Sequence, residues 1–279
     1  MPSSPILFAL LIGLFTLFAC YRLYLARRQA KAKSLRGLSA LTHIIDIIKL
    51  TQQHRGLYAG RLNGQNVSQA NLNTIRTQID RHYDQLINSP DKALKRLIRK
   101  SHQMWGALLI NPTQDVNKSF HLHSSLIQRL LDCLWDIADE YALTSHTDQN
   151  IQNLANDLVR TLPKLTEAIG QVRAITLQVT NTKYCSADKK LLLLFTLGKI
   201  QRDLSQVKPK LQKQSYDNLV AFIEEITKSV EDQALSNRNP DSFFTEASSH
   251  IDIIFNNIQS GLKELKAQVL LEPKHRKRV

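Results

Sequence analysis

The chain has 279 residues, enough for one large or two small domains with a substantial core. Hydrophobic residues make up 43% and aromatic residues only 6%, with 9 glycines and 8 prolines, which favours a helical protein with few tight turns. The 37 Lys and Arg against 24 Asp and Glu give a formal charge of +13, which indicates an anionic partner such as nucleic acid, anionic lipid or a small anion. Cys20, Cys133 and Cys185 are too few and too scattered for a disulfide framework or a cysteine metal motif.

The N-terminus carries an apolar run of the length that crosses a membrane. Residues 6–21 are apolar apart from Gly13 and Thr16, and residues 22–26 extend the run to about 20 residues. The opening MPSSP has no charged side chain, whereas Arg and Lys are frequent between residues 22 and 36, which is unlike a cleaved signal peptide. By the positive-inside rule, the sequence predicts one uncleaved anchor in the inner (cytoplasmic) membrane, with the chain that follows in the cytoplasm.

Eight further helices are predicted, because apolar residues recur at spacings of three and four and turn-forming residues separate the runs. They cover about 34–62, 68–87, 91–110, 119–143, 150–180, 186–207, 209–235 and 240 onward. A kink is expected near Pro163, since a proline inside a helix removes a backbone hydrogen bond. The prediction is an all-α fold of about eight helices in two packed antiparallel bundles, after one N-terminal transmembrane helix. It divides the chain into a stub (1–4), an anchor (5–26), a basic juxtamembrane segment (27–37), a helical domain (38–271) and a basic tail (272–279).

An arginine interrupts the apolar face of the first soluble helix. Residues 41–48 form a stripe at the spacing of a buried helix face, and the next positions on that stripe are Gln52 and Arg55. Taking an unpaired guanidinium out of water costs several kcal/mol, so Arg55 is expected to have an anionic partner. Gly56 and Gly60 lie beside it and leave room for a second helix or a ligand.

The fifth predicted helix repeats the pattern. An apolar stripe over residues 158–169 continues to Arg173. Two interpretations follow from the residues alone: each arginine pairs with a nearby Asp or Glu, or Arg55 and Arg173 converge on one anion. The planar fork of guanidinium N–H donors suits small planar oxyanions such as nitrate, nitrite or carboxylate.

Four segments also resemble a known family, the nitrate- and nitrite-sensing (NIT) domains. They are QQHRGLYAGRLNG, IRTQIDRHYDQL, LPKLTEAIGQVRAITLQ and SFFTEASSHIDIIFNNIQSGLKEL, which come in the family's order within residues 38–271. The resemblance implies a helical two-bundle sensor that binds nitrate or nitrite between helices through arginines. Arg55 and Arg173 match the family's arginine positions, and His54 and Gln52 beside them extend the candidate set.

Other signals have simpler explanations. His121 and His123, in FHLH, have the spacing of a metal pair but no companion ligands, so a solvated helix end is expected. Trp105 and Trp135 are expected in the core. The tail KHRKRV suits anionic lipid or nucleic acid, although a solubilising end is the preferred interpretation.

The predicted function is a membrane-anchored, cytoplasm-facing sensor for nitrate or nitrite, without a metal or other cofactor. An enzyme is not expected, because Cys133 and Cys185 lack a flanking base and no catalytic constellation is found. No output module is recognised, so signalling would proceed by helix rearrangement in a homodimer or through an unknown partner. One alternative is a helical scaffold in which Arg55 and Arg173 pair with carboxylates. A nucleic-acid-binding protein, suggested by the charge alone, ranks last because no base-reading motif accompanies it.

Overall fold

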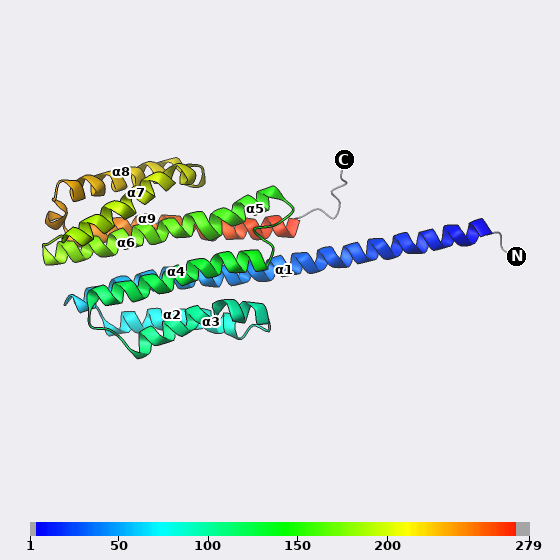
Figure 1. Ribbon diagram of the computed structural model, residues 1–279, viewed down its shortest axis with the longest axis horizontal. Coiled ribbons are helices and arrows are strands. Elements are labelled where there is room, and N and C mark those ends of the chain that lie inside the picture. Colours follow the sequence, from blue (N-terminus) through cyan, green and yellow to red (C-terminus); the bar gives the residue numbers. More distant parts are fainter. Residues whose placement is uncertain (1–3, 272–279) are drawn as a thin grey trace.

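The computed structural model describes residues 4–271, and every regular element in that range is a helix (Figure 1). The α-helices are α1 (Ser4–Leu62), α2 (Gln69–Ile87), α3 (Lys92–Ile110), α4 (Val116–Glu140), α5 (Gln149–Asn156), α6 (Leu162–Thr182), α7 (Ala187–Val207), α8 (Lys213–Glu231) and α9 (Pro240–Leu271). One π turn, η1 (Asp157–Thr161), joins α5 to α6, and two 3-10 turns, η2 (Lys208–Lys210) and η3 (Leu235–Asn237), flank α8.

The helices form two bundles that lie side by side. In the first bundle α1 packs against α2 and α4, and α3 packs against α4. In the second bundle α6 packs against α9 and α7, and α7 packs against α8. The bundles meet where α1 and α4 face α6 and α9 (Figure 1). The predicted all-α, two-bundle architecture is confirmed.

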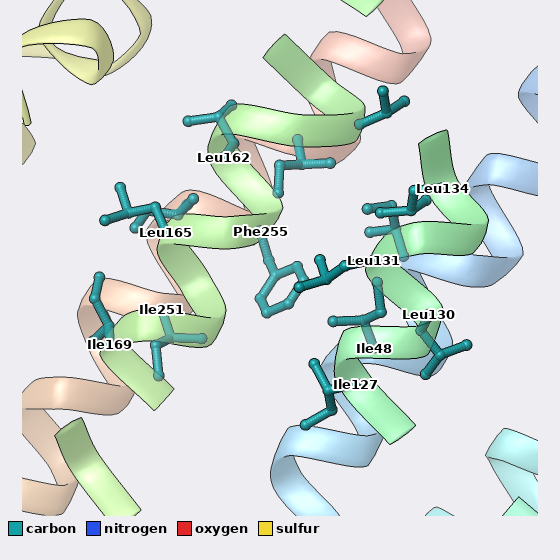
Figure 2. Close-up of a cluster of buried hydrophobic side chains, with 14 of the residues drawn as sticks. Ile48, Ile127, Leu130, Leu131, Leu134, Leu162, Leu165, Ile169, Ile251 and Phe255 are labelled. Carbon is teal, nitrogen blue, oxygen red and sulfur yellow. The ribbon is translucent and has the colours of Figure 1, made fainter. Parts of the chain in front are cut away.

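Aliphatic side chains fill the junction between the bundles. Figure 2 shows side chains from α4 on one side and from α6 and α9 on the other, with Phe255 of α9 directed towards Leu131 of α4. All of the labelled side chains are buried: Ile48, Ile127, Leu130, Leu131, Leu134, Leu162, Leu165, Ile169, Ile251 and Phe255. Because burying one such side chain is worth about 1.5–3 kcal/mol, this layer stabilises the contact between the two bundles.

Helix α1 is a single uninterrupted helix that combines three predicted segments. Its large apolar side chains between Phe8 and Tyr24 are exposed, whereas burial begins at Ser34 and the apolar face from Leu38 to Ile48 is buried. Among the described helices it is the one long and apolar enough to cross a membrane, and none of its most apolar stretch is buried. Since no break marks the ends of the anchor or of the juxtamembrane segment, their boundaries stay predictions.

Most helix boundaries follow side-chain caps. Ser68, Asp91, Ser186 and Asn239 each accept hydrogen bonds from backbone N–H groups of the first turn that follows, as their positions in the sequence predict. Gly64, at φ +78°, takes the left-handed conformation just after α1.

Three boundaries differ from the prediction. The fifth predicted helix is divided by η1, in which the N–H of Leu162 donates to the C=O of Asp157, just before Pro163. A widened turn accommodates the proline, which has no N–H to donate. The fourth helix begins earlier, at Val116, because Asp115 caps it, and it ends at Glu140. The seventh predicted helix shortens to α8 between η2 and η3.

The two tryptophans have different environments. Trp105 is buried as expected, and its indole N–H donates to Asp80 at 2.7 Å. The expectation for Trp135 is wrong: it is 37% exposed, and the guanidinium of Arg160 lies 5.2 Å from the centre of its ring. A cation over an aromatic face is stable at a partly solvated surface, so no burial in the core is required.

Candidate anion-binding site

Arg55 forms a buried ion pair with Glu167 of α6. The arginine side chain is 1% exposed, and its two terminal nitrogens reach the two carboxylate oxygens at 2.7 and 3.2 Å. Arg55 Nη1 also donates to the hydroxyl of Ser124 on α4 at 2.8 Å. Of the two interpretations that the sequence left open, the structure shows the carboxylate pair for this arginine.

The local sequence of α6 creates the space for this pair. Glu167 and Gly170 lie one turn apart, and a Cβ on Gly170 would come within 2.8 Å of Arg55 Nη2. The amides of Gln52 and Gln171 donate to the same carboxylate at 3.1 and 2.9 Å. A carboxylate with four such hydrogen bonds offsets much of the cost of burying the two charges.

Arg173 has different surroundings. It is 5% exposed, and its Nη1 donates to the hydroxyl of Ser248 on α9 at 2.8 Å, while Nη2 makes a longer contact of 3.4 Å with the backbone oxygen of Gln52. The ring of Phe244 lies under the guanidinium, 4.9 Å from its central carbon. Within residues 4–271 no carboxylate forms an ion pair with Arg173. Its positive charge is therefore buried with only neutral direct partners.

Burial, and then the charge of Arg55, lower the pKa of Arg173 to about 10. Both causes act against the charged form of the guanidinium. At neutral pH the side chain is still protonated, so an anion bound beside it would be favoured electrostatically.

A pocket of about 430 Å³ opens in front of Arg173. Residues of α1, α2 and α9 form the walls of the pocket, and α6 contributes Arg173 to its lining. The aromatic ring of Phe244 and the hydroxyl of Ser248 also line it, and Lys49 and Asp252 pair with each other on its wall at 2.9 Å. Since a water molecule takes about 30 Å³ in the liquid, the pocket has room for a four-atom anion with several waters.

Gln52 connects the ion pair to the pocket. Its side-chain N–H₂ donates to Glu167, its backbone oxygen contacts Arg173, and the residue lines the pocket. Its side-chain oxygen is buried and has no hydrogen-bond partner in the described part of the chain. Arg55 itself does not line the pocket, although it lies close enough to affect the pKa of Arg173.

His54 lies apart from this pocket. Its ring is buried, hydrogen-bonded to His123 at 2.8 Å, and accepts from Arg76 Nε at 3.1 Å. Burial lowers the pKa of His54 to about 3 and that of His123 to about 4, so both rings are neutral. His123 was expected at a solvated helix end, and the structure buries it instead, whereas His121 is exposed.

Other arginines and the cysteine thiols do not converge on the site. Arg202 is exposed on α7, and Arg238 pairs with Glu225 on α8. Burial raises the pKa of the Cys133 and Cys185 thiols, which disfavours the reactive thiolate. No three His, Cys, Asp or Glu side chains gather as a metal site between residues 4 and 271.

Sequence reasoning missed Glu167 and Ser248. Glu167 precedes Arg173 by six residues, with Gly170 midway, which places all three near one face of α6 and could have indicated the carboxylate. Ser248 lies on α9, about 75 residues further along the chain, and no local signal indicates its contact with Arg173.

Comparison with known proteins gives one structural similarity. No family model and no curated protein matches the chain. Among solved structures it is similar to that of the NasR transcription antiterminator, with a TM-score of 0.70 and 13% sequence identity, over 93% of this chain and 75% of that chain. The two proteins share a fold. At this identity the similarity extends to architecture and not to residues.

Proposed function

We propose that the chain is a membrane-anchored sensor in which Arg173 binds nitrate or nitrite. The observation that carries the proposal is the buried guanidinium of Arg173, which faces a pocket and has no carboxylate partner among the described residues. Glu167 and Asp252 attract the guanidinium only from beyond ion-pair distance. A buried charge without a direct counter-charge is costly, and a bound anion would relieve that cost.

The surroundings of Arg173 suit a small planar oxyanion. Two hydrogen bonds, to Ser248 and to the backbone of Gln52, account for part of its five N–H donors. The remaining donors are available for a bidentate contact with two oxygens of one anion. The resemblance of four segments to the nitrate- and nitrite-sensing domains supports this choice of ligand, and the fold shared with a transcription antiterminator supports a regulatory role.

The other candidate residues have graded roles in this proposal. Gln52 contacts the anion or its water, since it lines the pocket. Arg55 is paired with Glu167, so it positions α1 against α6 beside the pocket and does not take part in binding the anion. His54 packs against α4 and supports the position of α1 without touching the ligand.

A bound anion would act as a switch on helix packing. The Arg173 guanidinium lies between α1 and α9 without an ion pair, and a negative charge in the pocket would attract it. The helices α1, α6 and α9 would then move closer, which shifts the balance between two packings. Because α1 continues into the proposed anchor, the change would pass to the membrane segment, to a second copy of the chain or to a separate partner.

Calorimetric titration of the detergent-solubilised chain with nitrate, nitrite and chloride tests the proposal. We expect heat with nitrate or nitrite and little with chloride. Arg173→Gln should weaken binding by about thirtyfold, since a hydrogen bond to a charged group is worth about 2 kcal/mol. Arg202→Gln, on an exposed arginine of α7, is the matched control and should bind as the parent does. Absence of heat with every oxyanion would overturn the proposal.

A scaffold without a ligand is the second candidate, and the complete Arg55–Glu167 pair favours it. Under this alternative the pair has replaced an anion site, and Arg173 is held adequately by Ser248 and Phe244. It predicts that Arg173→Gln is neutral or stabilising in thermal unfolding. The sensor predicts that nitrate raises the unfolding temperature of the parent and not of the variant.

A further inference from the structure

Helix α3 carries a row of exposed basic side chains, called here the basic row. They recur every three or four residues on the face turned away from the core: Lys92, Lys95, Arg96, Arg99 and Lys100. In the part of the chain that the structure describes, no carboxylate lies within ion-pair distance of any of them. The other basic segment that the sequence indicates, the tail 272–279, lies outside the described residues.

The neighbouring helix α4 carries an acidic row over its last turns. Its carboxylates are exposed or half-buried, and they have the same helical spacing: Asp132, Asp136, Asp139 and Glu140. Arg129 lies 4.0 Å from Asp132 and 3.5 Å from Asp136, and Lys33 lies 3.6 Å from Glu140. Ion pairs exposed in this way are weak, so the carboxylates can still attract a further cation.

The two rows lie at the same level along the first bundle. Helices α3 and α4 pack against each other, and the hydroxyl of Tyr141 donates to Asp91 at 2.6 Å, so the start of α3 lies beside the end of α4. Each row therefore extends over about 14 Å from the same end, with Lys92 level with Glu140. The contact of Glu140 with Lys33 places this end where α1 leaves the bundles (Figure 1).

A two-fold axis parallel to the helices makes these rows complementary to themselves. Rotation about such an axis, in front of the contact between α3 and α4, exchanges the two helices and keeps their level. The basic row of each copy then meets the acidic row of the other. The same axis leaves both α1 helices pointing in one direction, as insertion of both proposed anchors into one membrane requires.

We propose that a second copy of the chain docks on this surface, with α3 of each copy against α4 of the other. The inference rests on the membrane anchor of the proposed function and assigns a surface to the homodimer expected from the sequence. Lys92 then faces Glu140 of the second copy, and Lys100 faces Asp132 of the second copy. Because exposed ion pairs are weak, they select the partner and its orientation, while attachment of both copies to one membrane raises their local concentration.

Helix α4 connects this surface to the candidate anion site. It packs against α1, whose residues Lys49 and Gln52 line the pocket. A movement of α1 on anion binding would therefore shift α4 and the surface that meets the second copy.

Reversed charges test the surface in the full chain. The α3-reversed chain carries Lys92→Glu, Arg96→Glu and Lys100→Glu, and the α4-reversed chain carries Asp132→Lys, Asp136→Lys and Glu140→Lys. In two identical copies of either chain, like charges face each other at these positions. A mixture of the two chains places opposite charges at both contacts again.

Energy transfer between donor-labelled and acceptor-labelled chains in phosphatidylcholine vesicles measures the association. We expect the parent to exceed the transfer of random approach, and about 1 M NaCl, with a Debye length of about 3 Å, to weaken its association. Association of either reversed chain with itself should be weaker by at least about tenfold, since several exposed pairs are lost at once. The mixture should recover the transfer of the parent, which also shows that both reversed chains fold.

Reversals of the same number of charges on the second bundle provide the control. One control chain carries Lys199→Glu, Arg202→Glu and Lys213→Glu, and the other carries Asp217→Lys, Glu224→Lys and Glu231→Lys, all at exposed positions. Each should associate with itself as the parent does. Full transfer in either reversed chain alone, a mixture that stays apart, or equal losses in the control chains would overturn the inference. Parent association that requires added phosphatidylglycerol would also overturn it, in favour of lipid headgroups on the basic row.

Failure of the anchor gives a different result. A chain that carbonate washing removes from the vesicles contradicts the anchor of the proposed function. A chain that stays in the vesicles and binds nitrate, but shows only the transfer of random approach, contradicts the docking surface alone.

Discussion

Two arginines are buried at the junction of α1 and α6, and only Arg55 has a carboxylate partner. Arg55 shares two hydrogen bonds with Glu167, whereas Arg173 relies on a hydroxyl, a backbone oxygen and an aromatic face. Under the proposed function, Arg55 has a structural role and Arg173 a binding role. Breaking the compensated pair should affect stability, while changing Arg173 should affect ligand affinity.

Glu167→Gln is expected to destabilise the fold by about 3 kcal/mol. The substitution keeps the shape of the side chain but leaves the Arg55 guanidinium buried without a counter-charge. Urea unfolding monitored by circular dichroism measures the change. Glu225→Gln, which breaks the partly exposed pair with Arg238, is the control and should cost less than about 1 kcal/mol. Equal losses in the two variants would contradict the structural role of the buried pair.

The neutral histidine pair should make the fold sensitive to mild acid. Burial lowers the pKa of His54 to about 3 and that of His123 to about 4, below the ordinary 6.5 that applies to the unfolded chain. The unfolded state therefore binds more protons below pH 6.5. The stability that these rings contribute is complete above that pH and decreases as the pH falls, by up to about 1.4 kcal/mol per pH unit for each ring.

His123→Gln should reduce this slope by about one proton between pH 6.5 and 5. Unfolding free energies at several pH values measure it, and the exposed His121→Gln serves as the control. His43 and His250, whose pKa values burial also lowers, add to the slope equally in all variants. An unchanged slope in His123→Gln would show that the ring is not held neutral.

At the scale of elements, α3 is fixed at its start by one carboxylate. Asp91 accepts from the backbone N–H groups of Ala93 and Leu94, and from the hydroxyl of Tyr141 at 2.6 Å. Tyr141 follows α4, so the same side chain both caps α3 and joins it to the end of α4. That hydrogen bond, the largest cause, lowers the pKa of Asp91.

Asp91→Ala is expected to cost about 2 kcal/mol, because it removes the cap and the hydrogen bond to Tyr141. Tyr141→Phe removes only the hydroxyl and should cost about 1 kcal/mol. The double variant should be no less stable than Asp91→Ala, since the shared bond is already lost. Chemical unfolding of the parent and the three variants gives a double-mutant cycle. Losses of unfolding free energy that add up in the double variant would contradict the link between α3 and α4.

At the scale of the whole molecule, α1 joins the two-bundle domain to the proposed membrane segment without a hinge. Because residues 4–62 form one uninterrupted helix, a displacement of α1 at the pocket would also move its N-terminal part. The second bundle contributes Arg173 and Ser248, and the first contributes Gln52. The candidate site thus exists only where the bundles meet.

Reporter fusions at the C-terminus test the orientation of the chain. The basic residues after the apolar run predict a cytoplasmic domain, so a fused green fluorescent protein should be fluorescent and a fused alkaline phosphatase inactive. Deletion of residues 1–26 should release the protein from the membrane fraction and leave the fluorescence. An active phosphatase would reverse the predicted orientation.

The sequence by itself determined the helices and the arginines that interrupt their apolar faces. Periodic apolar residues and local caps such as Ser68 and Asp91 act within a few residues, so the all-α class and most boundaries could be predicted. The same periodicity marked Arg55 and Arg173 as buried arginines, and both are buried.

Only the tertiary structure decided which partner each arginine has. Glu167 lies 112 residues from Arg55 in the other bundle, so this contact depends on how the two bundles dock. Ser248 lies 75 residues from Arg173 within the second bundle, and their contact depends on how α9 packs against α6. Packing of α4 against α1 within the first bundle also turned His54 towards His123 and away from the pocket, a choice between faces of α1 that periodicity cannot make. Periodicity specifies that a side chain is buried; the packing of distant helices specifies what surrounds it.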